Sequence, residues 1–396
     1  MAKELDIEKI RKDFPITNKV TFLASASVAP MPLRTIEAMK EMLTKAYIEY
    51  DKRYWEWTED IYEMCRKAAS KLINAEPHEI ALVKSTTDGI NAFASGIKWK
   101  QGDNIIINEL EYPANVIPWY HQAKRHGLKV KVVESTNSKV LPKSIANAID
   151  SKTRVVSVSH VEFGSGFKHN LKELSSIVHE NNTFLFVDAI QSIGAIKVDV
   201  KELDVDALAA GGYKWMCGPV GTGIMYVRKD LMSRINPSYV GFDSIDEKEA
   251  RKLWNNLVKG LPYVKDYRVL ASSARRFEYG SMTAVGFKGL QTSIEYLLDL
   301  GIENIEDRIT VLVDYLIKRL KEKQFKIQTP VEKKYRAGIV NFKPHINLQN
   351  KHKFNKLYKR LLDANVRVDI REGGIRVACH IFNTEDDIDK LLEVVS

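Results

Sequence analysis

Seven short apolar runs lie between residues 79 and 227, and helical stretches separate most of them. The runs cover residues 79–84, 103–109, 129–134, 153–159, 183–187, 206–210 and 222–227, and the helical stretches cover 88–98, 114–126, 142–150 and 171–181. Because the runs are apolar almost throughout instead of alternating, both faces of each strand should be buried. Strands and helices in this order predict an α/β fold, whose large domain has a mostly parallel seven-stranded sheet flanked by helices.

The pattern changes near residue 283, where two long helical segments begin. Helices are expected at 284–300, 303–324, 351–364 and 384–394, and strands at 337–342, 366–370 and 374–379. This mixture is typical of a smaller α+β domain. The N-terminus adds a short helix at 4–13 and a strand at 20–23. A chain of 396 residues is long enough for two domains, and we expect a large one at 15–285 and a small one built from 1–14 and 286–396.

Two of the expected strands are followed by residues that carry chemistry. Asp188 ends one apolar run, and Lys214 follows the next run after Gly211 and Gly212. Ligands of parallel sheets bind at the carboxyl ends of strands, and the small residues would let a bulky group lie against the backbone. Pyridoxal phosphate suits the pair, because the lysine can form its imine and the aspartate can keep its ring nitrogen protonated. A buried ion pair at the strand ends is the alternative.

A run of hydroxyls opens the first helix of this region. Ser85, Thr86 and Thr87 follow the run 79–84 and begin the helix at 88–98. Free backbone N–H groups at a helix N-terminus, with hydroxyls beside them, can bind a phosphate. An ordinary N-cap explains the same residues. The position lacks the G-x-G-x-x-G pattern of a dinucleotide site, which argues against a dehydrogenase.

Three further residues follow strand ends and could contact a bound cofactor. Gln191, three residues after Asp188, could reach the phenolic oxygen of the ring or be an ordinary turn residue. Tyr112 could stack on a flat ring, although an aromatic residue before proline is more often simple packing. His160, after the run 153–159, is a candidate for acid–base catalysis or hydrogen bonding, with a structural role as the alternative.

Two arginines near the C-terminus suit a carboxylate ligand. Arg371 and Arg376 lie in I-R-E-G-G-I-R-V, and Arg376 lies within a short apolar strand. A guanidinium fork in that place could bind the α-carboxylate of a substrate. A salt bridge to Glu372 or to another acid is the alternative.

The three cysteines are far apart in the sequence. Cys65, Cys217 and Cys379 show no metal-ligand spacing, and their odd number argues against a disulfide framework. Cys217 could be a nucleophile, but its place three residues after Lys214 is better explained by a small packed side chain. We therefore expect neither a metal site nor a structural disulfide.

Bulk properties narrow the remaining classes of function. The net charge is +9, but the lysines are interleaved with Glu and Asp, and no nucleic-acid-binding pattern accompanies them. We expect no nucleic-acid partner, and a positive field would also suit small anionic substrates. No apolar run approaches the roughly 20 residues of a membrane span, and the first residues lack the apolar region of a signal peptide. A cytoplasmic protein without a membrane partner is expected.

Six motifs occur together in one order. They are S-T-T-D-G-I-N at 85–91, E-Y-P-A-N at 111–115, V-D-A-I-Q at 187–191, G-Y-K-W at 212–215, R-F-E-Y-G at 276–280 and I-R-V at 375–377. The chain resembles the class V aminotransferase group of fold-type I pyridoxal phosphate enzymes. That group includes cysteine desulfurases, selenocysteine lyases, epimerase-like proteins and several transaminases. The resemblance runs from Phe22 to Glu385 and so covers nearly the whole chain.

The resemblance implies a role for most of the candidate residues. Lys214 would form the imine with the cofactor and Asp188 would contact its ring nitrogen; with His160 they make up the expected catalytic set. The expected cofactor-binding set is Thr86, Thr87, Tyr112, Asp188, Gln191, Tyr213, Lys214 and Ser281, in which the two threonines hold the phosphate. Arg376 would bind the substrate carboxylate, with Arg371 beside it. In the family, the residue at the position of Ser281 often contacts the cofactor phosphate of the neighbouring subunit. The resemblance therefore implies a homodimer with active sites at the interface.

Departures from the family pattern bear on the reaction. Desulfurases and selenocysteine lyases usually have histidine at the positions of Tyr112 and Tyr213. The desulfurase loop with its catalytic cysteine would lie near Arg371, where this chain has no cysteine. Cys379 lies beyond Arg376 and is wrongly placed to carry a persulfide, so desulfuration through a protein cysteine is disfavoured.

These observations predict a homodimeric pyridoxal phosphate enzyme acting on an amino acid. A class V aminotransferase ranks first, a cysteine or selenocysteine lyase that eliminates at a C–S bond comes second, and an amino-acid epimerase comes third. All three need a neutral Lys214 amine to move protons at Cα, so burial should lower its pKa. A non-catalytic binding protein on the same fold is expected to lose Lys214 or Asp188, and both are present.

Overall fold

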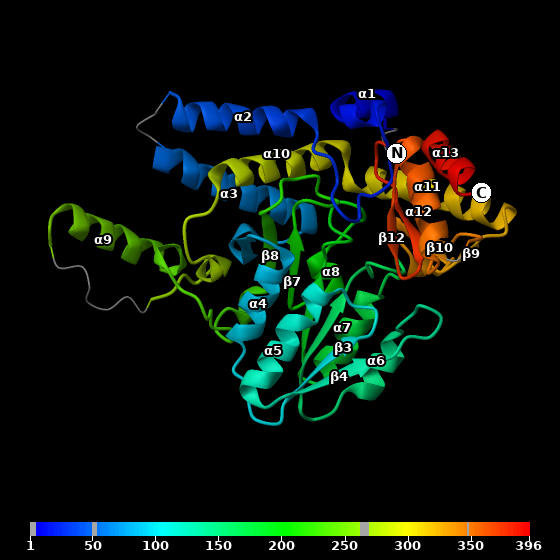
Figure 1. Ribbon diagram of the computed structural model, residues 1–396. Coiled ribbons are helices and arrows are strands. Elements are labelled where there is room, and N and C mark those ends of the chain that lie inside the picture. The colour runs from blue at the N-terminus through cyan, green and yellow to red at the C-terminus, as the bar shows by residue number, and fades with distance from the viewer. Residues whose placement is uncertain (1–4, 50–53, 262–268, 347) are drawn as a thin grey trace.

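The centre of the molecule is a seven-stranded sheet, shown in a computed structural model that describes residues 5–49, 54–261, 269–346 and 348–396 (Figure 1). The strand order is β2-β8-β7-β6-β5-β3-β4. The bounds are β2 Ile80–Val83, β3 Asn104–Asn108, β4 Lys129–Val133, β5 Thr153–Ser159, β6 Phe184–Asp188, β7 Ala207–Gly211 and β8 Gly223–Val227. Strand β8 runs antiparallel to both of its neighbours, and the other pairs are parallel. The predicted mostly parallel sheet is therefore confirmed.

Helices cover both faces of this sheet, as the apolar strands require. Phe186 of β6 packs against Phe93 and Trp119, with ring centroids 5.1 and 5.9 Å apart, while the adjacent Leu185 and Val187 belong to a second apolar cluster. Successive side chains of a strand point to opposite faces, so one face contacts α4 and α5 and the other contacts α6, α7 and α8. Their bounds are α4 Thr86–Gly96, α5 Ile117–His126, α6 Pro142–Ala148, α7 Leu171–Glu180 and α8 Val200–Leu203.

Three long helices pack together above the sheet (Figure 1). Helix α10 (Ala284–Leu300) lies against both α2 (Leu33–Tyr47) and α3 (Tyr54–Ile73). Helix α11 (Ile302–Glu322) follows after Gly301, whose φ of +83° is accessible at low cost only to glycine. The break between the predicted helices 284–300 and 303–324 is therefore correctly placed.

A second sheet of four antiparallel strands forms near the C-terminus, in the order β12-β13-β10-β9. The prediction of one strand at 366–370 is wrong, because its two halves bond to different partners. The first half, β11, pairs with β1 near the N-terminus, and the second half, β12, pairs with β13. The bounds are β1 Thr21–Phe22, β9 Lys326–Ile327, β10 Ile339–Lys343, β11 Val366–Arg367, β12 Asp369–Arg371, β13 Gly374–Ala378, α12 Lys351–Asp363 and α13 Glu385–Val395.

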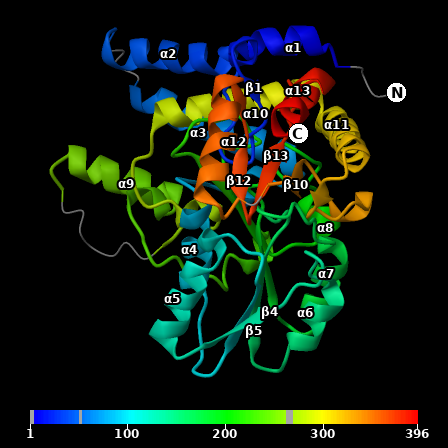
Figure 2. The same ribbon diagram turned by 45° about the vertical axis from the view of Figure 1, so that its right-hand side comes forward.

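The first helix, α1, and the last helix, α13, lie together (Figure 2). Helix α1 (Ile7–Asp13) reaches α13 through Arg11, whose Nη1 lies 3.2 Å from the Asp387 carboxylate. The β1–β11 pair adds a backbone connection between the same regions. The N-terminal segment is thus attached to the C-terminal part of the structure.

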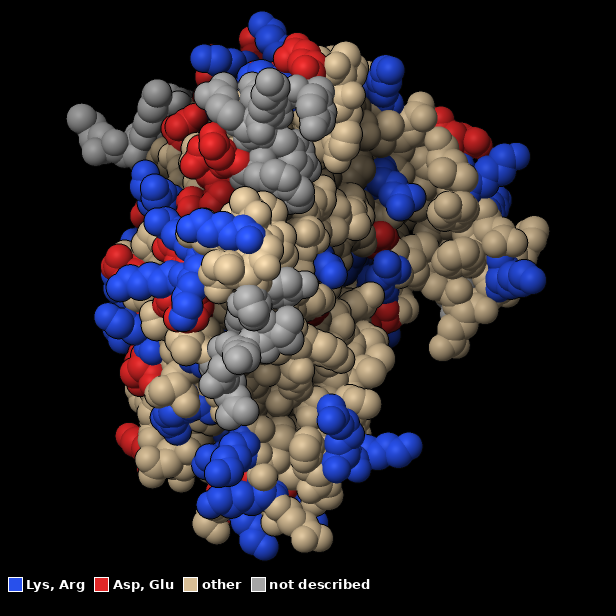
Figure 3. Space-filling model, turned by 90° about the vertical axis from the view of Figure 1, so that its left-hand side faces the viewer, with Lys and Arg blue, Asp and Glu red and all other residues tan. Residues whose placement is uncertain are grey.

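One helix projects from the body of the molecule (Figure 1). Helix α9 (Glu247–Val258) has no buried residue, and the sequence patterns predicted no element there. In the part of the chain that the structure describes, no helix combines the length and apolar character needed to cross a membrane. On the face shown in Figure 3, Lys and Arg are mixed with Asp and Glu above and predominate at the lower end.

Candidate active site

Asp188 and Lys214 are brought together by the ends of two adjacent strands. Asp188 is the last residue of β6 and pairs in register with Ala209 of β7, and Lys214 follows the end of β7 by three residues. Their side chains are buried, with Asp188 2% and Lys214 8% exposed. No ion pair joins the two groups among the described residues, so the alternative of a simple strand-end salt bridge is not what the structure shows.

Burial changes the protonation of both groups. It lowers the pKa of Lys214 to about 8, assisted by Arg376 and opposed by Asp188. It also raises the pKa of Asp188 to about 6, although the Ile190 N–H donates to its Oδ1 at 3.0 Å. The lysine can therefore lose its proton near neutral pH, while the aspartate stays charged above about pH 6. The predicted fall in the pKa of Lys214 agrees with this environment.

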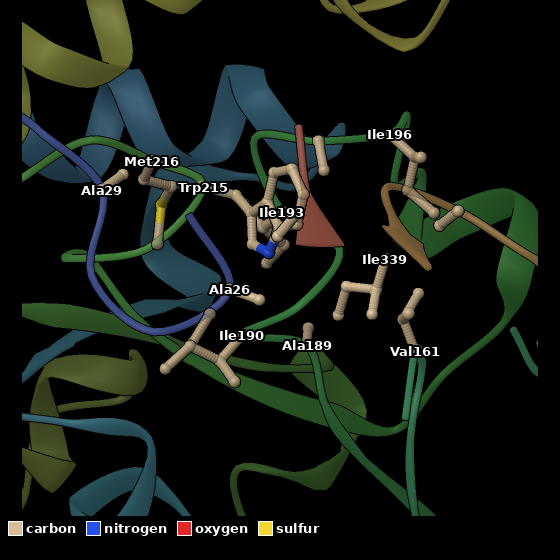
Figure 4. Packing of buried hydrophobic residues seen from close by; sticks show 14 of the residues in the cluster. Ala26, Ala29, Val161, Ala189, Ile190, Ile193, Ile196, Trp215, Met216 and Ile339 are labelled. Carbon is tan, nitrogen blue, oxygen red and sulfur yellow. The ribbon is translucent and has the colours of Figure 1, made fainter. Parts of the chain in front are cut away.

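Trp215 anchors the loop that carries Lys214. Its ring lies among apolar side chains that include Ala26, Ile193 and Ile339 (Figure 4). The indole Nε1 donates to Gln191 Oε1 at 2.8 Å, and the backbone oxygen of Trp215 lies 3.0 Å from the Nε2 of His380. These contacts fix the backbone next to the reactive amine.

Removing this anchor should lower stability strongly. We expect Trp215→Ala to reduce the free energy of unfolding by about 3–5 kcal/mol, because a fully buried indole leaves a cavity. Urea denaturation followed by circular dichroism measures the loss. Trp254→Ala is the matched control, since that indole is exposed on α9 and its removal should have little effect. Equal losses in both variants would contradict the anchoring role.

Gly211 and Gly212 serve protein packing, which corrects the expectation that they make room for a bound group. A Cβ on Gly211 would lie 2.9 Å from the Tyr213 ring. A Cβ on Gly212 would lie 2.6 Å from Leu290 of α10 and 3.0 Å from the Thr222 hydroxyl. The glycines allow α10 and the Tyr213 ring to approach the backbone closely. Contact with these neighbouring side chains therefore explains why small residues stand at the two positions.

The N-terminus of α4 lies at the end of β7. Thr86 Oγ1 accepts the backbone N–H of Gly211 at 2.9 Å, which joins the helix start to the lysine loop. The N-cap alternative also holds, because Ser85 Oγ accepts the N–H of Asp88 at 3.1 Å. Thr87 is exposed. Of the two threonines, only the Thr87 hydroxyl faces solvent.

Two tyrosine rings flank the Lys214 amine. Its Nζ lies 5.7 Å from the centroid of the Tyr112 ring and 5.9 Å from that of Tyr213. Tyr112 packs edge-to-face on Phe163 and remains 46% exposed, which leaves ring surface open. Tyr112 and Tyr213 thus form aromatic walls beside the amine.

Gln191 is held by the protein on both ends of its amide. Its Nε2 donates to the Ala26 oxygen at 3.0 Å, and its Oε1 accepts from Trp215. Contact with a ring oxygen stays a prediction, and the second N–H of the Gln191 amide is the donor that it would use. Gln191 lies beside the site, and hydrogen bonds to Ala26 and Trp215 fix the orientation of its amide.

His160 and Ser281 are not gathered around the amine. The His160 backbone N–H donates to the Asp188 oxygen at 2.9 Å, but its ring lines a separate cavity on the α7 side of the sheet. Ser281 is exposed just before α10. Within the described part of the chain, no hydrogen bond joins the His160 ring to the Asp188 carboxylate or the Lys214 amine, and Ser281 is accessible to another molecule.

Arg376 forms a buried ion pair, as the alternative interpretation allowed, but with Asp369. Its Nη2 lies 2.7 Å from Asp369 Oδ2 and 2.6 Å from the Ser27 hydroxyl, and its Nη1 donates to the Phe163 oxygen at 2.8 Å. Arg371 is exposed, and its closest acid is Asp369 at 4.0 Å. Both arginines contribute to the field at Lys214. A carboxylate ligand would find Arg371 exposed, with its Nη1 donating to the Ile370 oxygen at 2.9 Å, and Arg376 paired with Asp369.

Sequence reasoning missed Ser27 and Asp369. Asp369 lies opposite Arg376 across the β12–β13 hairpin, which turns at Gly373. Counting outward from that glycine turn would have paired the two positions. No comparable signal existed for Ser27, which reaches the pair from a distant turn.

All three cysteines are buried and unbonded to each other. Burial raises the pKa of Cys65 and of Cys379 to about 12, and it raises the pKa of Cys217 further. A thiolate is the reactive form of cysteine, so none of these residues is prepared to accept sulfur. The expectation that Cys217 is a packed residue agrees with its environment.

Known proteins resemble the chain over nearly its full length. The family described as Aminotransferase class-V matches residues 21–391. A probable cysteine desulfurase of Pyrococcus abyssi is 30% identical, over 98% of this chain and 96% of its own length. A cysteine desulfurase of Thermococcus onnurineus has a TM-score of 0.86 at 26% identity, covering 100% and 98% of the two chains. A cystine C–S lyase bound to cysteine persulfide shares the fold, with a TM-score of 0.85 at 22% identity over 97% and 99%.

The chain belongs to the class V aminotransferase family. It is an enzyme of this pyridoxal phosphate-dependent family, and pyridoxal phosphate is its cofactor. The side chains present fit that cofactor, since the site offers a buried amine of lowered pKa and a buried carboxylate that has no ion-pair partner among the residues the structure describes. The fold-type I architecture and the family resemblance are confirmed.

Proposed function

We propose that the chain is a lyase that breaks the C–S bond of a cysteine-type amino acid by β-elimination and uses no protein thiol. The observation that carries this proposal is that all three cysteines are buried, while Lys214 and Asp188 are both present at the strand ends. The cysteine desulfurases among the relatives and the cystine C–S lyase of the same fold support sulfur chemistry. The proposal moves the lyase, ranked second from the sequence, ahead of the aminotransferase.

In this proposal each site residue would contact a different part of the cofactor. Lys214 would hold it covalently, Asp188 would contact its ring nitrogen, and Tyr112 and Tyr213 would flank its ring. Gln191 would lie beside the ring oxygen. Thr86 and Thr87 at the N-terminus of α4 would hold the phosphate, because backbone N–H groups and the helix dipole there favour an anion. The bound cofactor supplies an electron sink for negative charge at Cα of the substrate.

The protein's own groups then direct the reaction. The neutral amine of Lys214 removes the Cα proton, and burial keeps that amine available near neutral pH. Arg371 binds the substrate carboxylate with its exposed guanidinium, and Arg376 orients the same region through Asp369. The Cβ–S bond breaks with its electron pair going to sulfur, which then takes a proton. For cysteine the balanced result is cysteine plus water giving pyruvate, ammonia and hydrogen sulfide.

Transamination is the second candidate. The burial of all three cysteines favours transamination over desulfuration as much as it favours elimination. Transamination would leave the sulfur on the product. It differs from elimination in requiring a 2-oxo acid, which would accept the amino group and return the cofactor to its aldehyde form. No observation in the site favours epimerisation, which ranked third.

We also propose that the enzyme is a homodimer. The exposed position of Ser281 supports this, because that hydroxyl is free to reach the phosphate of a neighbouring subunit. Sedimentation velocity gives the mass of the particle, and Ser281→Ala should weaken cofactor binding only if the hydroxyl contacts the phosphate.

Product analysis tests the proposed reaction. The purified holoenzyme with L-cysteine or L-cystine should release pyruvate and ammonia in equal amounts without a 2-oxo acid. Alanine as the product would indicate desulfuration, and turnover only with a 2-oxo acid would indicate transamination. Either result would overturn the proposed elimination.

A further inference from the structure

The hairpin between β12 and β13 turns at two residues, Glu372 and Gly373. Their φ angles are +50° and +69°, and Arg371 on one side pairs in register with Gly374 on the other. Two-residue turns with positive φ at both positions favour asparagine or glycine at the first of them, and a long side chain there is strained. A glutamate in this position indicates that its side chain contributes something that asparagine or glycine would not.

The carboxylate of Glu372 lies directly on the backbone of Gly164. A Cβ on Gly164 would overlap both of the Glu372 carboxylate oxygens. The φ of Gly164 is not positive, so its backbone conformation does not require glycine. Clearance for this carboxylate is therefore the reason why Gly164 has no side chain.

One buried amide joins the turn to the segment that carries Gly164. Asn341 of β10 is fully buried, and its Nδ2 donates to the Gly164 oxygen at 3.0 Å and to the Arg371 oxygen at 3.1 Å. The two acceptors lie on either side of the contact between Glu372 and Gly164. Asn341 thus fixes the hairpin turn against this segment, and with it the place of the Glu372 carboxylate.

The same segment forms a wall of the site around Lys214. The Phe163 oxygen accepts from Arg376 Nη1 at 2.8 Å, and the Phe163 ring packs on Tyr112 with centroids 5.0 Å apart. The Tyr112 ring is in turn 5.7 Å from the Lys214 amine. Glu372 therefore belongs to the rim of the site, which consists of Tyr112, Phe163, Gly164, Arg371 and Glu372.

The Glu372 carboxylate has no partner of its own. Arg376 pairs with Asp369, and the closest acid to Arg371 is also Asp369, at 4.0 Å. Gln328 reaches only the backbone oxygen of Glu372. Among the residues that the structure describes, no hydrogen bond or ion pair engages the carboxylate, although the residue is exposed. An unpaired anion thus stands beside the exposed guanidinium of Arg371.

A cationic group is the ligand that suits this carboxylate. Packing against the protein raises the pKa of Glu372, with Arg376 opposing the effect, so a cation bound beside it would stabilise the charged form. In the proposed reaction Arg371 takes the α-carboxylate of the substrate, and the amino group at Cα reacts with the cofactor. The cation that pairs with Glu372 must therefore come from the far end of the substrate side chain.

We propose that Glu372 is a specificity-determining residue that pairs with an ammonium group at the end of the substrate side chain. L-Cystine carries such a group in its second half, whereas L-cysteine does not, so the disulfide is the preferred substrate. The inference rests on the C–S elimination proposed above. For L-cystine the balanced result is cystine plus water giving pyruvate, ammonia and cysteine persulfide.

Ligand binding to the cofactor-loaded wild type and to Glu372→Gln tests the pairing. L-Lysine and L-2-aminoheptanoic acid have no leaving group at Cβ, and they differ only in an ammonium or a methyl group at the end of side chains of equal length. Calorimetric titration should show that the preference of the wild type for L-lysine is about fivefold greater than that of Glu372→Gln. An equal ratio of the two dissociation constants in both proteins would overturn the proposal.

Turnover of a second pair of compounds tests the same residue in the reaction. S-(2-Aminoethyl)-L-cysteine and S-propyl-L-cysteine differ in the same two end groups, and both carry sulfur at Cβ. The ratio of their kcat/KM values for pyruvate release should fall by about fivefold in Glu372→Gln, through the aminoethyl compound alone. If neither compound releases pyruvate, the proposed elimination fails, and the L-lysine titration decides the role of Glu372.

Two control variants separate recognition from net charge and from folding. Glu180→Gln removes an exposed carboxylate at the opposite end of the sheet, because α7 ends just before β6 begins, and it should keep the wild-type ratio. Glu372→Asn places a residue favoured at positive φ in the turn, so it should lose the preference but unfold at an equal or higher urea concentration. Loss of stability in this variant, or an equal change of ratio in Glu180→Gln, would overturn the proposal.

Discussion

Lys214→Ala should eliminate the visible absorbance of the bound cofactor and lower turnover by about 10³- to 10⁴-fold. The reason is that Nζ of Lys214 is the only amine placed among Asp188, Tyr112 and Tyr213 in the described structure. Borohydride should fix the cofactor to the wild type at Lys214 and leave the variant unlabelled. Peptide mass spectrometry locates the label.

Lys214→Arg is the matched control for that experiment. It keeps a cation in the same place but cannot form an imine, so it should be as inactive as the alanine variant. Thermal unfolding shows whether both variants are folded. Turnover near the wild-type rate in either folded variant would exclude Lys214 as the cofactor lysine.

Asp188→Asn should lower turnover by about 10²- to 10³-fold, because the amide keeps the shape of the side chain and removes its charge. The change should also stabilise the cofactor-free protein. Burial raises the pKa of Asp188 from 3.8 to about 6, so the charged carboxylate is a cost to the folded state that accumulates as pH rises from 3.8 to 6. Above pH 6 the gain should be about 3 kcal/mol.

The pH dependence of this variant supplies its own check. Denaturation of the cofactor-free wild type should show stability falling across that pH window relative to Asp188→Asn, with equal stability at low pH. Asp230→Asn is a suitable control, since that carboxylate is exposed. A variant that loses stability at pH 8, or that keeps full activity, would contradict the role given to Asp188.

Much of the fold could be predicted because burial leaves a direct pattern in the sequence. The apolar runs at 153–159 and 183–187 became β5 and β6 within one residue, since both faces of a parallel strand must be apolar. Asp188 stood out by the same rule, because it is the first charged residue after the apolar run, and it is the last residue of β6. Lys214 was found through its place after the next strand.

The parts that were missed depend on contacts between distant segments. The split of 366–370 into β11 and β12 is decided by β1, far away in the sequence. The burial of Gly212 against Leu290 and the pairing of Arg376 with Asp369 and Ser27 have the same origin. His160 was expected at the site because it follows β5, but the alternation of side chains beyond the strand end places its ring at another cavity.

The central claim is that sulfur leaves the substrate without help from a protein cysteine. The measurement that tests it most directly is pyruvate and sulfide release from L-cysteine by Cys65→Ala, Cys217→Ala and Cys379→Ala, each loaded with the cofactor. We predict rates within about twofold of the wild type for every variant that folds, because each thiol is buried and protonated. Loss of sulfide release in one folded variant, with a persulfide on that cysteine in the wild type, would contradict the claim.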